Sequence, residues 1–227
     1  MKAMILAAGR GERMRPLTDN LPKPLLKVAG KMLIEYHLEK LSAAQITDVV
    51  INHAWLGEKI EQALGDGSRY ALNIHYSPEE EALETAGGIV NALPLLRGVT
   101  DESEAFIVIN GDIYCDYDIS NLPSSLSGLA HLVLVNNPPH NPEGDFVLTK
   151  SGLVEKTGIN KKTFSGIGVY HPDLFKDYPS GKLALAPVLR KAMEKNQVSG
   201  EFYQGGWHDI GTPERLDELE RYLTNNE

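Results

Sequence analysis

Cysteine is almost absent from this 227-residue sequence, in which Cys115 is the single example. One cysteine cannot form a disulfide bond within the chain, and it provides no Cys/His spacing of the kind that binds structural zinc. We therefore expect neither disulfide bonds nor a zinc site. Cys115 is expected to be a small core residue rather than a reactive thiol.

Long hydrophobic runs are absent as well, since no stretch is apolar for long enough to span a membrane as a helix. The start, Met1-Lys2 followed by a short apolar run and Gly-Arg-Gly, does not fit a cleavable signal peptide. We therefore expect a cytoplasmic protein. No internal repeat is found, and in particular no hexapeptide repeat of the kind that builds an appended β-helix.

Basic residues are too few to balance the acidic ones, and the net charge is −9. This charge argues against non-specific binding to nucleic acid or to an anionic membrane. The basic residues nevertheless gather in one place. The segment 9–31, which we call the basic segment, contains Arg10, Arg13, Arg15, Lys23, Lys27 and Lys31 against only Glu12 and Asp19.

Short apolar runs alternate with stretches of helical periodicity through the first 110 residues. This alternation predicts an α/β fold with a doubly wound, mostly parallel mixed sheet flanked by helices, of the Rossmann-like type. Ligands bind such sheets at the carboxyl ends of the strands. The expected strands are 3–8, 49–51, 72–76 and 106–109, and the expected helices are one from about Met32, 56–64 and 86–96.

After Asp118 the pattern changes to strands with fewer helices between them. We expect strands at 131–136, 146–149, 153–155 and 164–170, and helices at 184–194 and 213–223. The last helix should begin at an N-cap Thr212 with Pro213 in its first turn. We expect one domain, residues 1–227, in which residues 1–118 and 119–227 form the two sides of a ligand cleft.

The first group of chemically informative residues follows the first expected strand, which ends at Gly9-Arg10-Gly11. Glycine allows the backbone to approach a ligand closely, and Arg13 and Lys23 could then contact phosphate oxygens. The dinucleotide pattern G-x-G-x-x-G fails at Met14, and no G-x-x-x-x-G-K-[ST] occurs. A plain tight turn is the alternative, but the strand before it and the basic residues after it favour a phosphate-binding loop.

The string Leu-Ala-Ala-Gly-Arg-Gly-Glu-Arg-Met-Arg-Pro-Leu-Thr from Leu6, with Pro-Lys-Pro-Leu from Pro22, resembles the signature of the sugar 1-phosphate nucleotidylyltransferases. Pyrimidine-transferring enzymes of cofactor synthesis share the opening strand and loop but usually lack the Pro-Leu-Thr and Pro-Lys-Pro-Leu portions. Within the family, the chain is similar to the small uridylyltransferases that act on N-acetylmuramate 1-phosphate in cell-wall recycling.

The resemblance implies a nucleotide-binding half in residues 1–118 and a sugar-binding half in residues 119–227. Arg13 and Lys23 would bind the phosphates, Thr85 would meet the base, and Gly88 would begin a helix. Glu84 departs from the glycine that is common among relatives at its position, which bears on base specificity. The backbone that would hold the base and the triphosphate is that of Leu6, Ala7, Ala8, Gly9 and Gly11.

Two carboxylates are candidates for a metal site. Asp112 directly follows the expected strand 106–109, where a hard oxygen ligand would stand at the mouth of the sheet, although an Asx turn is the alternative. Trp207-His208-Asp209 resembles a family string in which the Asp is the second metal ligand and the Trp lines the sugar pocket. The resemblance implies Mg²⁺ on Asp112 and Asp209, with phosphate oxygens and water as further ligands.

The sugar side has weaker signals. By resemblance, Glu155 would hold sugar hydroxyls, Lys156 would bind the 1-phosphate, and the backbone at Gly144 and Gly166 would contact the sugar. A surface salt bridge and ordinary turns are the alternatives. His208 needs no catalytic role, because the second pKa of the attacking phosphate monoester is about 6 and no general base is required.

The expected reaction is attack by a sugar 1-phosphate on the α-phosphorus of a nucleoside triphosphate, with UTP and N-acetylmuramate α-1-phosphate as the substrates that the similarity suggests. Guanylyl or uridylyl transfer to mannose, heptose or glucose 1-phosphate is an alternative. A non-catalytic nucleotide-sugar-binding regulatory subunit is another. It would be expected to lose a metal carboxylate or the loop arginine, whereas the four catalytic candidates Arg13, Lys23, Asp112 and Asp209 are all present. We expect small-molecule partners only and a monomer or weak homodimer, since the extension that carries acetyltransferase activity or oligomerisation in some relatives is lacking.

Overall fold

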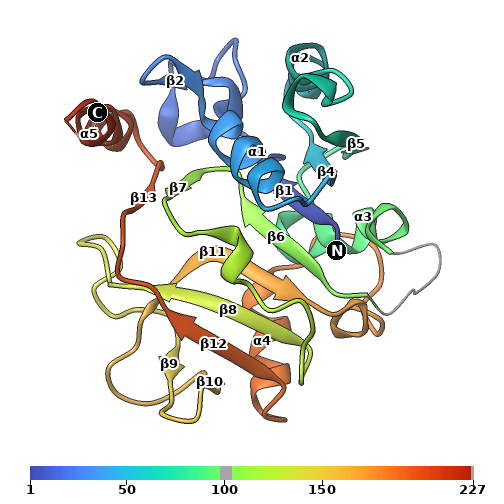
Figure 1. Cartoon of the computed structure of the whole chain (residues 1–227), viewed down its shortest axis with the longest axis vertical. Coiled ribbons are helices and arrows are strands. Elements are labelled where there is room, and N and C mark those ends of the chain that lie inside the picture. Colours follow the sequence, from blue (N-terminus) through green and yellow to red (C-terminus); the bar gives the residue numbers. More distant parts are fainter. Residues whose placement is uncertain (98–103, 226–227) are drawn as a thin grey trace.

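The computed structural model describes residues 1–97 and 104–225, and its centre is a seven-stranded sheet (Figure 1). The strand order is β12-β8-β11-β6-β1-β4-β5. All neighbours are parallel except β11, which is antiparallel to β6 and to β8. The predicted doubly wound, mostly parallel mixed sheet is therefore confirmed. The strands are β1 Ala3–Leu6, β4 Asp48–His53, β5 Asn73–Pro78, β6 Phe106–Asn110, β8 Ala130–Val135, β11 Thr163–Tyr170 and β12 Val198–Phe202.

Helices cover both faces of this sheet because side chains alternate along each strand. Ala3 and Ile5 of β1 pack into one buried cluster with α1 and α2, whereas Met4 packs into a second cluster with α3 and α4. In Figure 1, α1 accordingly lies in front of the sheet and α4 behind it. The helices are α1 Leu33–Ala43, α2 Gly57–Leu64, α3 Glu84–Leu96, α4 Leu185–Met193 and α5 Pro213–Thr224.

The expected elements of the second half are also present. Short strands β9, Val147–Leu148, and β10, Val154–Glu155, form a hairpin beside the sheet. Helix α5 begins as expected, since the Oγ1 of Thr212 accepts a hydrogen bond from the backbone N–H of Arg215. In the described ranges, no helix combines the length and the apolar character needed to cross a membrane.

One pair of short strands was not predicted, and it matters for the site. Strand β7, Ile113–Cys115, pairs antiparallel with β13, Trp207–Asp209, so that Asp209 lies opposite Ile113. The chain then continues into α5, whose Leu219 is buried with Met14 and Leu26 of the basic segment. The C-terminal segment thus returns to the N-terminal half and lies beside the end of β6. A further unpredicted pair is β2, Lys27–Val28, with β3, Lys31–Met32.

Candidate active site

The first cavity lies at the carboxyl ends of β1 and β6, where the parallel sheet was expected to bind its ligand. Its volume is about 440 Å³. Nine of the residues that the sequence analysis assigned to the nucleotide line it. They are Leu6, Ala7, Ala8, Gly9, Gly11, Arg13, Lys23, Thr85 and Asp112. The fold thus brings one wall from the loop after β1 and the other from the start of α3 and the end of β6.

The loop after β1 depends on a glycine. Gly11 has a φ of 68° in the left-handed region, and a Cβ built on it would lie 3.1 Å from the Cγ2 of Thr18. The hydroxyl of Thr18 donates a hydrogen bond of 2.8 Å to the Gly11 carbonyl, which holds this turn closed. A side chain here would be strained by the backbone conformation and by the contact with Thr18.

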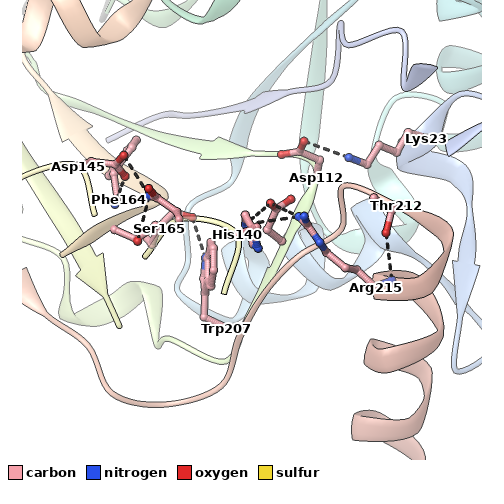
Figure 2. Close-up of polar contacts among 12 residues, drawn as sticks. Lys23, Asp112, His140, Asp145, Phe164, Ser165, Trp207, Thr212 and Arg215 are labelled. Atoms are coloured by element: carbon pink, nitrogen blue, oxygen red, sulfur yellow. Dashed lines mark hydrogen bonds and ion pairs between the residues drawn. The ribbon is translucent and has the colours of Figure 1, made fainter. Parts of the chain in front are cut away.

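Lys23 and Asp112 form an ion pair inside the first cavity (Figure 2). The Nζ of Lys23 donates to the Oδ2 of Asp112 at 3.0 Å. The lysine side chain is 9% exposed, whereas the carboxylate is 47% exposed, so the carboxylate remains open to a ligand. Arg13 lines the same cavity. A buried ammonium and a guanidinium on one wall provide the positive charge that a polyphosphate requires.

The second candidate carboxylate, Asp209, lies on the strand next to Asp112. The backbone N–H of Ile210 donates to the carbonyl of Asp112 at 2.8 Å, which ties the two segments together. The Oδ2 of Asp209 accepts from the Nη1 of Arg215 at 2.6 Å and lies 3.0 Å from the Nε2 of His140 (Figure 2). His140 comes from the loop between β8 and β9, so two segments of the second half, far apart in the sequence, meet at this carboxylate.

These two carboxylates fit a divalent metal that is shared with a phosphorylated substrate. Within the described ranges, no group of three His, Cys, Asp or Glu side chains could enclose a metal by itself. Asp112 and Asp209 supply only part of an oxygen coordination sphere, and Mg²⁺ typically completes such a sphere with waters and substrate phosphates. The donor set therefore suits a metal that binds together with the nucleotide.

Two residues near the carboxylates, His208 and Cys115, pack against other side chains of the fold. His208 faces away from Asp209 along β13, and its ring packs on Tyr222 and Tyr114 at centroid distances of 4.7 and 6.2 Å. Burial lowers its pKa. It is the packing of the ring among tyrosines, away from Asp209, that agrees with the non-catalytic interpretation. Cys115 is buried and free, and burial raises the pKa of its thiol to about 11, as suits a core residue.

A second cavity of about 520 Å³ opens beside the first. The two share Glu84, Thr85 and Asn110, so they are parts of one cleft. Apolar side chains from the 145–164 region and from α4 form most of the second cavity. The residues that line it without lining the first are Asp145, Phe146, Phe164, Ala184, Leu185, Ala186, Leu189 and Arg190.

The residues predicted for the sugar side do not line either cavity. Gly144 immediately precedes the lining residue Asp145, and Gly166 packs against the side chain of Asn110 where the two cavities meet. The Nε1 of Trp207 donates to the carbonyl of Ser165 at 2.8 Å (Figure 2). These three residues thus border the cleft.

Glu155 and Lys156 lie further out. Glu155 is exposed on β10. The Nζ of Lys156 forms an ion pair with the Oε1 of Glu194, just beyond α4. Lys156 therefore takes part in a surface salt bridge, and its predicted contact with the 1-phosphate would require this pair to open.

The expected start of α3 is wrong. The helix begins at Glu84, so Gly88 lies in its second turn and lines neither cavity. A Cβ on Gly88 would lie 2.7 Å from the Nδ2 of Asn52 and 2.8 Å from the Oε1 of Glu79, so close packing explains this glycine. Glu84 has a φ of 62°, a conformation that favours glycine, which accounts for the residue common at this place in relatives.

Several site residues escaped the sequence analysis. Asn52 lies near the end of β4 and Asp112 follows β6 at the same edge of the sheet, so the place of Asn52 directly after the expected strand 49–51 was a usable signal. Arg190, Arg215 and His140 follow no such pattern. Arg190 reaches the second cavity from α4, whereas Arg215 and His140 reach Asp209 from α5 and from a loop. Their positions depend on how α4, α5 and the segment after β8 pack.

The fold and the cleft define an α/β protein whose cleft at the strand ends suits a phosphorylated ligand, since Arg13, Lys23 and Asp112 line it and Asp209 lies next to Asp112. The chain belongs to the nucleotidyl transferase family, whose family model matches residues 2–226. The family resemblance stated from the sequence is confirmed, and with it the assignment as an enzyme.

Named relatives agree with this assignment. The chain is 56% identical to the N-acetylmuramate alpha-1-phosphate uridylyltransferase of Neisseria meningitidis, over 97% of each chain. It is 31% identical to the enzyme of the same name from Caulobacter vibrioides, over 93% of this chain and 92% of the relative. It is 29% identical to the mannose-1-phosphate guanyltransferase of Hypocrea jecorina, over 94% of this chain but 61% of that one.

A solved structure shares the fold. It is a Bacillus anthracis protein described as a glucose-1-phosphate thymidylyltransferase, in complex with sucrose. The two chains superpose with a TM-score of 0.81 over 98% of this chain and 94% of the other, at 22% sequence identity. At this identity the comparison supports the fold alone.

Proposed function

We propose that this enzyme transfers UMP from UTP to N-acetylmuramate α-1-phosphate, forming the nucleotide sugar and pyrophosphate in the recycling of cell-wall sugar. The observation that carries the proposal is the 56% identity to the Neisseria uridylyltransferase over 97% of each chain. The joined cavities support it, because one has the cations that a triphosphate needs and the other has the apolar walls that suit a substituted sugar.

In this proposal the nucleotide occupies the first cavity. The backbone from Leu6 to Gly11 and the side chain of Thr85 contact the base and the ribose, while Arg13 and Lys23 bind the phosphates. The sugar 1-phosphate occupies the second cavity, with its phosphate directed to the shared region around Asn110. The two anions are thus held next to each other, which converts their encounter into a step within one complex.

The chemical step is a single displacement. An oxygen of the sugar 1-phosphate attacks the α-phosphorus of UTP, and the bond from that phosphorus to the bridging oxygen of pyrophosphate breaks. The attacking phosphate is already ionised at neutral pH, because its second pKa is about 6, so no residue has to remove a proton. Arg13 and Lys23 stabilise the negative charge that grows on the departing pyrophosphate.

We propose Asp112 and Asp209 as the residues that hold Mg²⁺. When bound, Mg²⁺ would neutralise phosphate charge as a Lewis acid. Lys23 and Arg215 each donate to one of these carboxylates at 3.0 and 2.6 Å, so both carboxylates are held in a fixed orientation. UTP is a metabolite of the cytoplasm, so the proposal implies a cytoplasmic enzyme, and we expect a monomer or weak homodimer by size-exclusion chromatography.

The test is pyrophosphate release with Mg²⁺. UTP, GTP, CTP, dTTP and ATP are screened against the 1-phosphates of N-acetylmuramate, N-acetylglucosamine, glucose and mannose. We expect release with UTP and N-acetylmuramate 1-phosphate. Release with another pair, such as GTP and mannose 1-phosphate, would support the proposed type of reaction but show that the proposed substrates are wrong.

Two variants separate an enzyme from a nucleotide-sugar-binding regulatory protein. Asp112→Asn and Asp209→Asn should each lower the Mg²⁺-dependent rate about 100-fold or more, as is typical when one stabilising group is removed from a transition state. Asp217→Asn is the matched control, because Asp217 is exposed on α5. No release with any pair, from protein that binds UTP, would favour the regulatory protein. Full activity in both variants would remove Asp112 and Asp209 from the metal site.

A further inference from the structure

The two cavities differ in where their positive charge lies. Arg13 and Lys23 line the first cavity but not the second. Arg190 lines the second but not the first, and it is the only cation among the residues of that cavity. A substrate that spans the cleft therefore meets two cations at one end and a single, separate cation at the other.

Arg190 has no carboxylate partner among the residues that the structure describes. It lies in the last turn of α4 and is exposed on the cavity wall. Other cations around α4 are engaged, since Lys156 pairs with Glu194 and the Nζ of Lys191 lies 5.4 Å from the centre of the Tyr178 ring. The guanidinium of Arg190 is thus available to a ligand.

The acidic residue Asp145, which lines the same cavity, forms hydrogen bonds that stabilise the fold. Its Oδ2 accepts from the backbone N–H of Phe164 at 2.8 Å, and its Oδ1 accepts from the Nδ2 of Asn141 at 3.1 Å (Figure 2). These bonds hold the 141–145 loop against β11. Asp145 therefore shapes the cavity, and both of its carboxylate oxygens already accept hydrogen bonds from the protein.

Apart from Glu84, Thr85 and Asn110, which it shares with the first cavity, the rest of the second cavity is apolar. Phe146 and Phe164 form one side, and Leu185 and Leu189 of α4 form the other. Such walls suit a sugar ring and small methyl groups but offer nothing to a second anion. Arg190 lies one helical position beyond Leu189, at the edge of this apolar wall.

We infer that Arg190 binds the carboxylate of the lactyl group of the sugar substrate, so that the second cavity selects sugar 1-phosphates that carry a carboxylate. This inference rests on the proposed function. In the proposed function the 1-phosphate points to the region that the two cavities share, away from Arg190, which leaves Arg190 for a second negative group. A guanidinium binds a carboxylate with two parallel hydrogen bonds, which makes arginine well suited to this recognition.

The plain alternative is an arginine that merely caps the negative end of a helix dipole. Lys191 is the matched control for that role. It occupies the same last turn of α4, is exposed, and lines neither cavity of the cleft. A general effect of helix charge would change both variants alike, whereas recognition of the substrate requires only Arg190.

The experiment compares two acceptors with UTP in steady-state kinetics. One is N-acetylmuramate α-1-phosphate, and the other is its lactyl carboxamide, which has the same shape without the charge. For the natural acceptor, Arg190→Ala should raise KM about 10- to 100-fold, the range of a charged hydrogen bond, while kcat and the KM for UTP stay within about twofold. The wild type should prefer the acid to the amide by a similar factor, and Arg190→Ala should lose this preference.

Two further variants complete the design. Arg190→Lys should recover part of the preference, because it restores the charge without the fork, and Lys191→Ala should behave like the wild type. UTP binding measured by calorimetry shows that each variant is folded. If Arg190→Ala keeps the wild-type ratio of acid to amide, or if the wild type itself uses both equally, the inference is overturned while UMP transfer stands. If neither acceptor reacts and another pair does, the proposed function fails and the inference fails with it.

Discussion

The side chain of Asn52 donates a buried hydrogen bond of 2.6 Å from its Nδ2 to the Oε1 of Glu79. The second polar atom of each side chain also forms a hydrogen bond. The Oδ1 of Asn52 accepts from the N–H of Ala7 at 2.9 Å, and the Oε2 of Glu79 accepts from the N–H of Leu83 at 2.9 Å. This pair therefore connects the loop after β1 to the segment before α3, which are opposite walls of the first cavity.

Asn52→Ala should weaken both stability and nucleotide binding. It leaves the Glu79 carboxylate and the Ala7 N–H without their partner, and an unsatisfied buried group costs about 1–3 kcal/mol. We expect the free energy of unfolding to fall by that amount and the KM for UTP to rise more than kcat falls. Chemical denaturation and steady-state kinetics measure these effects.

Asn91→Ala is the control for this prediction. Asn91 also donates a side-chain hydrogen bond, to the Oγ of Ser77, but it lines neither cavity of the cleft. Its KM for UTP should be that of the wild type. An Asn52→Ala protein with an unchanged KM for UTP would show that the connection does not position the cavity walls.

Gly88→Ala should destabilise the protein although alanine is the better helix former. The added Cβ would lie 2.7 Å from the Nδ2 of Asn52 and would push the buried pair apart. Overpacking of this kind typically costs about 1–3 kcal/mol. Gly9→Ala is the contrast, because a Cβ there meets nothing within 4 Å. Thermal unfolding should show a lower midpoint for Gly88→Ala alone, and equal midpoints would mean that α3 shifts freely.

Lys23→Ala should reduce kcat about 100-fold through the loss of a cation from the polyphosphate site. Its matched control is Lys27→Ala in the same basic segment, because Lys27 is exposed on β2 and lines neither cavity of the cleft. The ratio of the two kcat values is the measurement. Equal rates would show that the basic segment acts only by its overall charge.

Acid should destabilise the protein through His37. Burial is the main cause that lowers the pKa of His37 to about 4, from 6.5 in the unfolded chain. Below pH 6.5 the unfolded state binds a proton that the folded state excludes, so stability falls as the pH drops from 6.5 to 4 and the effect levels off below 4. This shift corresponds to at most about 3 kcal/mol.

Urea denaturation at several pH values measures that slope. His37→Gln should flatten it between pH 6.5 and 4, whereas the exposed His75, replaced in the same way, should leave it unchanged. A slope that persists in His37→Gln would assign the acid sensitivity to other groups.

The sequence was sufficient to predict the strands whose two faces are both buried. Strands such as β1 and β6 appear as apolar runs because both of their faces are covered. Strand β12 lies at the edge of the sheet and contains Ser199, Gly200 and Glu201, so it has no such run. The three-residue strands β7 and β13 are too short for any periodicity and form only because the chain returns to pair with itself.

The site residues also divide into those that the sequence pattern predicts and those that depend on how distant elements pack. Asp112 could be predicted because it follows a buried strand, and Arg13 and Lys23 because they follow a glycine turn in a basic segment. Gly88 was expected at a helix start from the family resemblance alone, but it lies inside α3, where its close contact with Asn52 leaves no room for a side chain. Arg190 reaches the cleft only because α4 packs beside the second cavity, and helical periodicity alone does not identify which exposed residue faces a ligand.

The most direct test of the central claim is a competition in one vessel. The enzyme and Mg²⁺ are given UTP, GTP, CTP, dTTP and ATP in equal amounts, together with equal amounts of the four sugar 1-phosphates, and the early products are identified by liquid chromatography and mass spectrometry. UDP-N-acetylmuramate should be the dominant nucleotide sugar. Dominance of any other nucleotide sugar would contradict the proposed function.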